Sequence, residues 1–332
     1  MMLLSRANFS GMSTDSQALN SRTDDAEVPQ NAVLSKFPPA KREQQLAFVI
    51  IAVSLLAFAA AVPRARTPLL PVSAFIPAYE AALFIIDLIT AVLLLGQFTQ
   101  MRTRALLILA TGYLFDALII IPHALSFPGL FAPTGLLGAG SQTTAWLYMF
   151  WHGGFPIFVI AYAVLQNFGD RSGSSGRHLH ASAMEPMIYL VMVVGAVGAM
   201  TLLTTTGQQL LPNIMDGHNY TSAMKFVVTV VWVLSFVAFL VLWRRKSRSV
   251  LDLWLLVVMC VWICDIALSA VFNAGRFDLG FYAGRIYGLM AASFVLIVLT
   301  LEMSGLHSRC QGDSSTGTTD QNPGSRCSPN CE

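Results

Sequence analysis

The 332-residue sequence has little charge: Asp, Glu, Lys and Arg together make up 11% of it, whereas hydrophobic residues make up 55%. Soluble globular domains usually carry about a quarter charged residues. The deficit excludes an ordinary soluble domain and indicates a membrane protein. The net charge of +2 is too small to indicate an acidic or a basic partner.

The sequence also lacks the common motifs of catalysis. It contains no GxSxG, no HExxH, no phosphate-binding P-loop and no GxGxxG followed by an acidic ribose ligand. Its basic residues flank apolar runs, so membrane topology accounts for them without a nucleic acid. We therefore expect no enzyme activity, no cofactor and no nucleic-acid partner.

The five cysteines do not predict a metal site. Cys260 and Cys264 lie one helical turn apart in an apolar run, and Cys310, Cys327 and Cys331 lie in the polar C-terminal segment. Their spacing, together with the nearby histidine, fits no common zinc pattern. We expect buried thiols in the first pair and reduced thiols in the tail.

Long apolar runs separated by short polar bridges dominate the chain. Each run is long enough to cross a hydrocarbon core of about 30 Å at roughly 1.5 Å per residue. The sequence therefore predicts an all-α membrane protein with eight transmembrane helices in contact with the lipid bilayer. The predicted spans are Leu46–Val62, Pro77–Phe98, Ala105–Leu125, Thr144–Leu165, Pro186–Leu203, Met224–Trp243, Leu251–Phe272 and Phe281–Leu301.

Lys and Arg placement predicts the orientation. Eight spans put both termini on one side, and five of the 20 basic residues fall on the other side or at its span entrances: Arg64, Arg66, Lys225, Arg276 and Arg285. The positive-inside rule then places both termini in the cytoplasm. We expect a multi-pass membrane protein.

The polar segments divide the chain into three predicted regions. Residues 1–45 are expected to form a disordered cytoplasmic leader, 46–303 the membrane domain, and 304–332 a disordered tail. A Gly/Ser-rich bridge at 166–186 separates the first four spans from the last four. Because the third span of each half carries one aspartate, Asp116 or Asp265, the sequence suggests two parallel four-helix halves.

Several ionisable residues lie inside the predicted spans. Asp87, Asp116, His152 and Asp265 are near the middle, and Arg285 lies about one turn from one end. A charge at the bilayer centre costs at least about 2.5 kcal/mol, so these groups are expected to face one another or a polar cavity. One interpretation is a structural network with the pairs Asp265–Arg285 and Asp116–His152. A second interpretation is a cavity that senses a small ligand or protons. A third is a transport path.

Glu80 and His123 also lie in spans, but within about one turn of an end. Polar groups at that depth escape the hydrocarbon by extending toward water, so no special role is predicted for them.

Small residues predict close helix packing at two places. Gly280, Gly284 and Gly288 recur every four residues at the start of the last span. Gly153 and Gly154 follow His152 directly, and glycines at such positions let a neighbouring backbone approach.

The run "FPGLF-PTGLLGAG-QT-AWLYMFWHGGFP", which begins at residue 127 and contains His152, resembles the MASE4 family of bacterial membrane-associated sensor domains. The likeness extends over about residues 45–303. The resemblance implies a sensory input domain of the bacterial inner membrane that normally precedes a cytoplasmic diguanylate cyclase or histidine kinase. It implies no particular stimulus, so the small ligand stays unknown. A homodimer is expected because such outputs work as dimers. A cytoplasmic signalling partner is expected if the chain works as a stand-alone sensor.

The segment after Arg309 departs from the family pattern. It has no apolar periodicity and is too short for a domain core. We expect that the output domain is missing here through truncation or a frame shift, or that a partner supplies it. The alternative to a sensor is a small-solute, proton or cation transporter that uses Asp87, Asp116 and Asp265.

Overall fold

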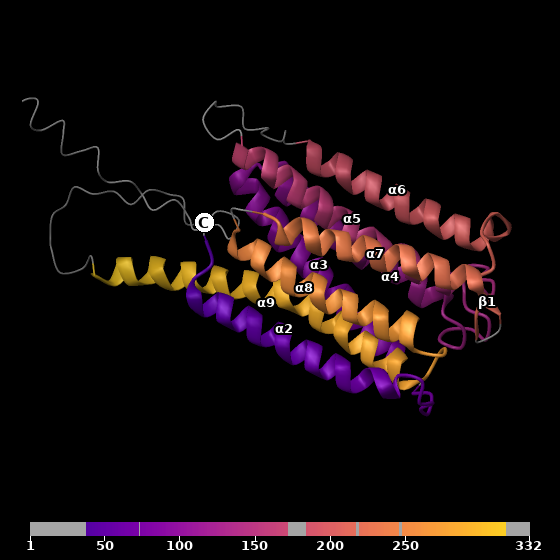
Figure 1. Cartoon of the computed structure of the whole chain (residues 1–332). Coiled ribbons are helices and arrows are strands. Elements are labelled where there is room, and N and C mark those ends of the chain that lie inside the picture. Colours follow the sequence, from indigo (N-terminus) through magenta and orange to yellow (C-terminus); the bar gives the residue numbers. More distant parts are fainter. Residues whose placement is uncertain (1–37, 73, 172–183, 217–218, 246–247, 317–332) are drawn as a thin grey trace, which may run out of the picture. The chain divides into compact units, whose positions relative to one another are not determined.

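The structure is a computed structural model that describes residues 38–72, 74–171, 184–216, 219–245 and 248–316. In these ranges eight helices are long and apolar enough to span a membrane, as predicted (Figure 1). The helices are α2 (Lys41–Ala61), α3 (Phe75–Met101), α4 (Arg104–Ser126), α5 (Thr143–Arg171), α6 (Glu185–Thr205), α7 (Ser222–Trp243), α8 (Val250–Ile266) and α9 (Leu279–Thr316). Short elements connect them: η1 (Val62–Arg64), η2 (Gln208–Leu210), the antiparallel strands β1 (Met215–Asp216) and β2 (Asn219–Tyr220), and the π-helical η3 (Ala267–Phe272).

The first and last helices of the chain extend beyond the predicted spans. Helix α2 begins at Lys41 rather than Leu46, where Glu43 accepts a hydrogen bond from the Ala40 amide at 2.8 Å and so supports the first turn. Helix α9 continues to Thr316, so the segment predicted as a disordered tail from residue 304 is helical over its first part. Most of the predicted leader (1–37) and the end of the tail (317–332) lie outside the described residues.

The helices of the two halves pair in the same way. Within the halves, α3 packs on α4 and α4 on α5, as α7 packs on α8 and α8 on α9. Between the halves, α2 packs on α8 as α6 packs on α4, and α5 packs on α7 as α9 packs on α3. Exchanging the halves therefore reproduces these pairings, which supports the hypothesis of two parallel four-helix halves.

Burial separates central from peripheral helices. In α4 and α8, 78% of the most apolar window is buried, against 11% in α2 and 17% in α6. Helices α2 and α6 lie on opposite sides of the bundle (bottom and top of Figure 1). The third span of each half is thus a core helix, and the first span of each half is the one most available to lipid.

Two faces of the bundle are distinguished below. The terminal face is the one at which α2 begins. The distal face is the opposite one, and it carries the described connecting residues 62–72, 127–142, 206–216, 219–221 and 273–278. Strands β1 and β2 belong to the distal face, at the right of Figure 1.

Candidate functional site

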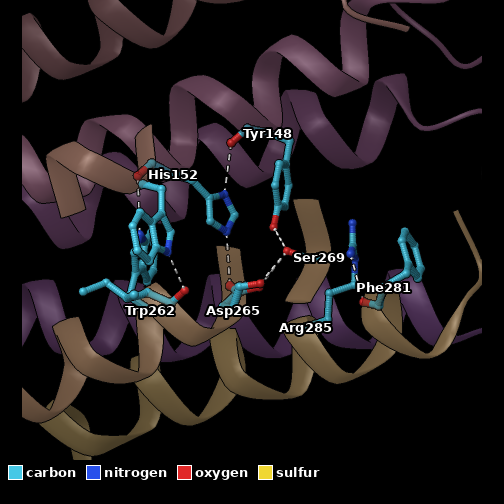
Figure 2. Close-up of polar contacts among 9 residues, drawn as sticks. Tyr148, His152, Trp262, Asp265, Ser269, Phe281 and Arg285 are labelled. Atoms are coloured by element: carbon cyan, nitrogen blue, oxygen red, sulfur yellow. Dashed lines mark hydrogen bonds and ion pairs between the residues drawn. The ribbon is translucent and has the colours of Figure 1, made fainter. Parts of the chain in front are cut away.

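The centre of the candidate site is a contact between α5 and α8. Nε2 of His152 lies 3.2 Å from Oδ2 of Asp265, and each side chain is 1% exposed (Figure 2). The prediction that His152 pairs with Asp116, and Asp265 with Arg285, is therefore wrong. Helix α5 packs mainly on α4 and α7, yet its His152 side chain reaches α8, a direction that sequence spacing alone does not reveal.

The geometry around His152 requires a shared proton. Nδ1 of His152 lies 3.0 Å from the Tyr148 carbonyl oxygen, which only accepts, so Nδ1 carries the hydrogen. A hydrogen bond between Nε2 and Asp265 then needs a proton on one of those two atoms. Both side chains of this contact are almost fully buried.

Asp265 continues this chain of hydrogen bonds toward the distal face. The Ser269 hydroxyl donates to the Asp265 backbone oxygen at 2.8 Å and lies 3.1 Å from its Oδ1. The Tyr148 hydroxyl lies 2.6 Å from Ser269 Oγ (Figure 2). Ser269 belongs to the π-helical segment η3, and π-helical turns within α-helices frequently occur at functional sites.

The last helix, α9, lies directly against the same carboxylate. A Cβ atom added to Gly284 would lie 2.9 Å from Asp265 Oδ1, and one added to Gly288 would lie 2.9 Å from Oδ2. Only glycine permits this approach, as the repeat of small residues predicted. Asp265 therefore contacts His152 on one side and the α9 backbone on the other.

Gly280 and Gly154 serve close packing as well. A Cβ at Gly280 would meet the Leu268 carbonyl oxygen at 2.5 Å, and one at Gly154 would collide with the Phe115 ring. Gly153 differs, because its added Cβ would meet only a Val231 methyl group at an ordinary 3.4 Å. The predicted close approach is thus made at Gly154 and not at Gly153.

Arg285 is 7% exposed and has a different environment from the one predicted. Its guanidinium donates to the Phe281 carbonyl oxygen at 3.0 Å, and its Cζ lies 3.6 Å from the centre of the Phe281 ring and 5.4 Å from that of Tyr148. These contacts are cation–π interactions. Figure 2 shows Arg285 beyond Ser269 and away from the His152–Asp265 contact.

Asp87 and Asp116 form a second buried polar cluster, between α3 and α4. Both are almost fully buried and interact electrostatically with each other and with Tyr113. Oδ1 of Asp116 and the Tyr113 hydroxyl have no hydrogen-bond partner among the residues that the structure describes. Two neighbouring carboxylates repel when both are ionised, so this pair favours a shared proton or a bound cation.

Sequence reasoning missed the pair Glu80–His123. Nδ1 of His123 lies 2.7 Å from Glu80 Oε1, and both residues are 2% exposed. Their similar depth in consecutive predicted spans was a usable signal. Polar groups near span ends usually reach water, but here the rings of Phe127, Tyr148 and Trp151 surround His123.

A fourth buried group lies near the terminal face and was also missed. Nε of Arg245 lies 3.3 Å from Asp252 Oδ2, and Asp252 accepts a hydrogen bond from the Tyr162 hydroxyl at 3.0 Å. Asp252 also forms a capping box with Ser249 that starts α8. Arg245 thus does more than set topology, because it neutralises a fully buried carboxylate.

We expect that Arg245→Met lowers the free energy of unfolding by about 2 kcal/mol, because Asp252 keeps two hydrogen bonds but loses its counter-charge. The neighbouring Arg244 is exposed, so Arg244→Met removes the same charge and should cost little. Denaturation in mixed micelles measures both variants. Equal stability of the two would contradict the role assigned to Arg245.

Within the described ranges, no group of three or more His, Cys, Asp and Glu side chains is arranged to hold a metal ion. The site is instead four separate buried polar groups: His152–Asp265, Asp87–Asp116, Glu80–His123 and Arg245–Asp252. The first of these touches α9.

Comparison with known protein families identifies a family for most of the chain. The profile of MASE4, described as a membrane-associated sensor, integral membrane domain, matches residues 71–306. The match begins after α2, so the first span lies outside it, although the likeness seen in the sequence began at about residue 45. No curated protein and no solved structure matches the chain.

Proposed function

Because the chain belongs to the MASE4 family of membrane-associated sensor domains, we propose that it is the input part of a signalling system and has no catalysis of its own. In this proposal a stimulus changes the His152–Asp265 contact, and α9 carries the change toward the C-terminal end. The output is supplied by a partner or by a domain that follows, and the active unit is a homodimer.

One observation carries the proposal: Asp265 lies between His152 and the α9 backbone at Gly284 and Gly288. A change in the proton or hydrogen bonds of Asp265 alters the space that α9 occupies. Packed interfaces respond to such changes by moving between discrete arrangements rather than by deforming continuously. Of the helices that touch Asp265, α9 is the one that continues to Thr316.

The orientation in this proposal has both termini in the cytoplasm of a bacterial cell. The uneven distribution of Lys and Arg between the two faces supports it. The distal face then meets the periplasm, and a signal that enters there would travel along α9 to the cytoplasmic side.

A chimera tests the sensor role. A diguanylate cyclase domain is joined after Thr316, and the cyclic dinucleotide produced in membranes is measured. Asp265→Asn keeps the size of the side chain but alters its charge, so we expect basal output to change by about fivefold or more. Gly195→Ala is the matched control, because a Cβ there meets nothing within 4 Å. Unchanged output in Asp265→Asn would contradict coupling through α9.

Transport is the competing function. The observation in its favour is that Oδ1 of Asp116 and the hydroxyl of the adjacent Tyr113 lack hydrogen-bond partners among the described residues. Proteoliposomes loaded with a pH-sensitive dye, under a proton or potassium gradient, distinguish the two. The sensor proposal expects no flux above that of empty liposomes. Flux that is lost in Asp116→Asn would favour the transporter.

A further inference from the structure

A small cavity lies near the distal face, and its lining includes Tyr148 and Ser269 of the hydrogen-bond chain that leads from Asp265. Its volume is about 40 Å³, enough for a few water molecules. The polar side chains that line it include Arg276, Arg285, Tyr148, Tyr220, Ser269 and His123. They come from α4, α5, α8–η3, α9 and the distal connections, so the cavity joins both halves of the domain.

Two arginines face this cavity without a carboxylate partner in the described part of the chain. Arg285 is more than nine-tenths buried and makes one hydrogen bond, to the Phe281 carbonyl oxygen. Arg276 lies over the Phe127 ring at 5.2 Å. Burial lowers the pKa of Arg276, and the positive charge of Arg285 lowers it further. Two cations therefore repel each other here, with several N–H donors unused.

The acidic groups nearby are engaged elsewhere. Asp265 contacts His152 and Ser269, and Glu80 contacts His123. Oδ1 of Asp278 accepts a hydrogen bond from the Phe281 amide in the first turn of α9, and Oδ2 accepts one from the Ala274 amide in the preceding connection. Burial raises the pKa of Tyr220, so its phenol stays neutral and does not offset the arginine charge. None of these carboxylates forms an ion pair with Arg276 or Arg285 in the described part of the chain, so the two guanidinium groups keep donors for a ligand.

We propose that this cavity binds the carboxylate group of a small organic acid, with Arg285 and Arg276 as its ligands. A guanidinium offers two parallel N–H donors that match the two oxygens of a carboxylate. The volume admits a carboxylate and few further atoms, which excludes large anions such as nucleotides. Met215, Met224 and Ala270 line the remainder and suit a short apolar chain. The binding of the acid does not depend on the proposed function. Only its role as the stimulus rests on that proposal.

Titration of the purified full chain in nanodiscs tests the site. The probes are acetate, propionate and succinate, with phosphate and chloride as inorganic anions, at constant ionic strength set with sodium isethionate. Calorimetry and the fluorescence of the protein's tryptophans report binding. We expect saturable binding of at least one carboxylate, and a loss of about tenfold or more in affinity in Arg285→Met and in Arg276→Met.

Arg64→Met is the matched control, because Arg64 is an exposed arginine of the distal face outside the cavity. It should bind as the unchanged protein does. If Arg285→Met fails to fold, Arg276→Met decides, since Arg276 lies in a connection rather than in a span.

Absence of saturable carboxylate binding, binding of phosphate or chloride alone, or equal affinity in all three variants would each overturn the proposal. Binding that leaves the cyclase chimera unaffected would contradict the acid as stimulus while leaving the binding site in place. If the output of the chimera changes in Asp265→Asn but the protein binds no carboxylate, the binding site is contradicted and the sensor role is kept.

Discussion

Asp265→Ala is expected to lower the free energy of unfolding by about 3 kcal/mol. The substitution leaves Nε2 of His152 buried without a partner, takes a hydrogen-bond acceptor from Ser269, and opens space next to α9. Losing one member of a buried, hydrogen-bonded pair is among the costliest single changes in a protein. Denaturation in mixed micelles, with tryptophan fluorescence as the signal, measures the change.

Asp265→Asn is the control for this prediction. The amide retains the shape of the side chain and can donate to a neutral His152, so the loss should be about 1 kcal/mol or less. If both variants were equally destabilised, the carboxylate charge rather than the hydrogen bond would hold the site together. If neither variant were destabilised, the His152–Asp265 contact would not contribute to the free energy of unfolding.

Gly284→Leu is expected to destabilise the domain by about 3 kcal/mol. A Cβ at this position would lie 2.6 Å from Ser269 Cβ and 3.0 Å from the Asp265 carbonyl oxygen, and neither of these groups is the flexible end of a side chain. Helix α9 must therefore move away from α8. Thermal unfolding of the purified protein measures the effect.

The matched substitution is Gly195→Leu on the peripheral helix α6, where an added Cβ meets nothing within 4 Å. Leucine is the better helix former, so this variant should be neutral or stabilised by up to about 1 kcal/mol. A similar loss in both variants would mean that any leucine harms these helices. The close α8–α9 contact would then not be the cause.

The two halves use their equivalent aspartates differently. Asp265, on α8, has a histidine partner and faces glycines, whereas Asp116, on α4, faces a second carboxylate and retains an unpaired oxygen. The helix pairings repeat between the halves, but the polar groups do not. Such a division leaves one half able to couple to α9 and the other with a buried acidic pair.

The sequence by itself determined the membrane class, the eight spans and the family. These follow from hydrophobic length and from one unusual run of residues, both of which are local properties. It also indicated that the ionisable residues in the middle of the spans are buried, because a charge deep inside an apolar span has no other low-cost place, but it missed Glu80, His123, Arg245 and Asp252.

Only the tertiary structure decided which of these groups meet. His152 contacts Asp265 rather than Asp116, and Arg285 faces a cavity rather than Asp265, because partner choice depends on helix rotation and on contacts between the two halves. Glu80 and His123 are buried for the same reason, since aromatic rings from α5 cover the end of α4. The depth of a residue in the membrane follows from its position along its span. The direction of its side chain depends on packing between helices that are far apart in the sequence.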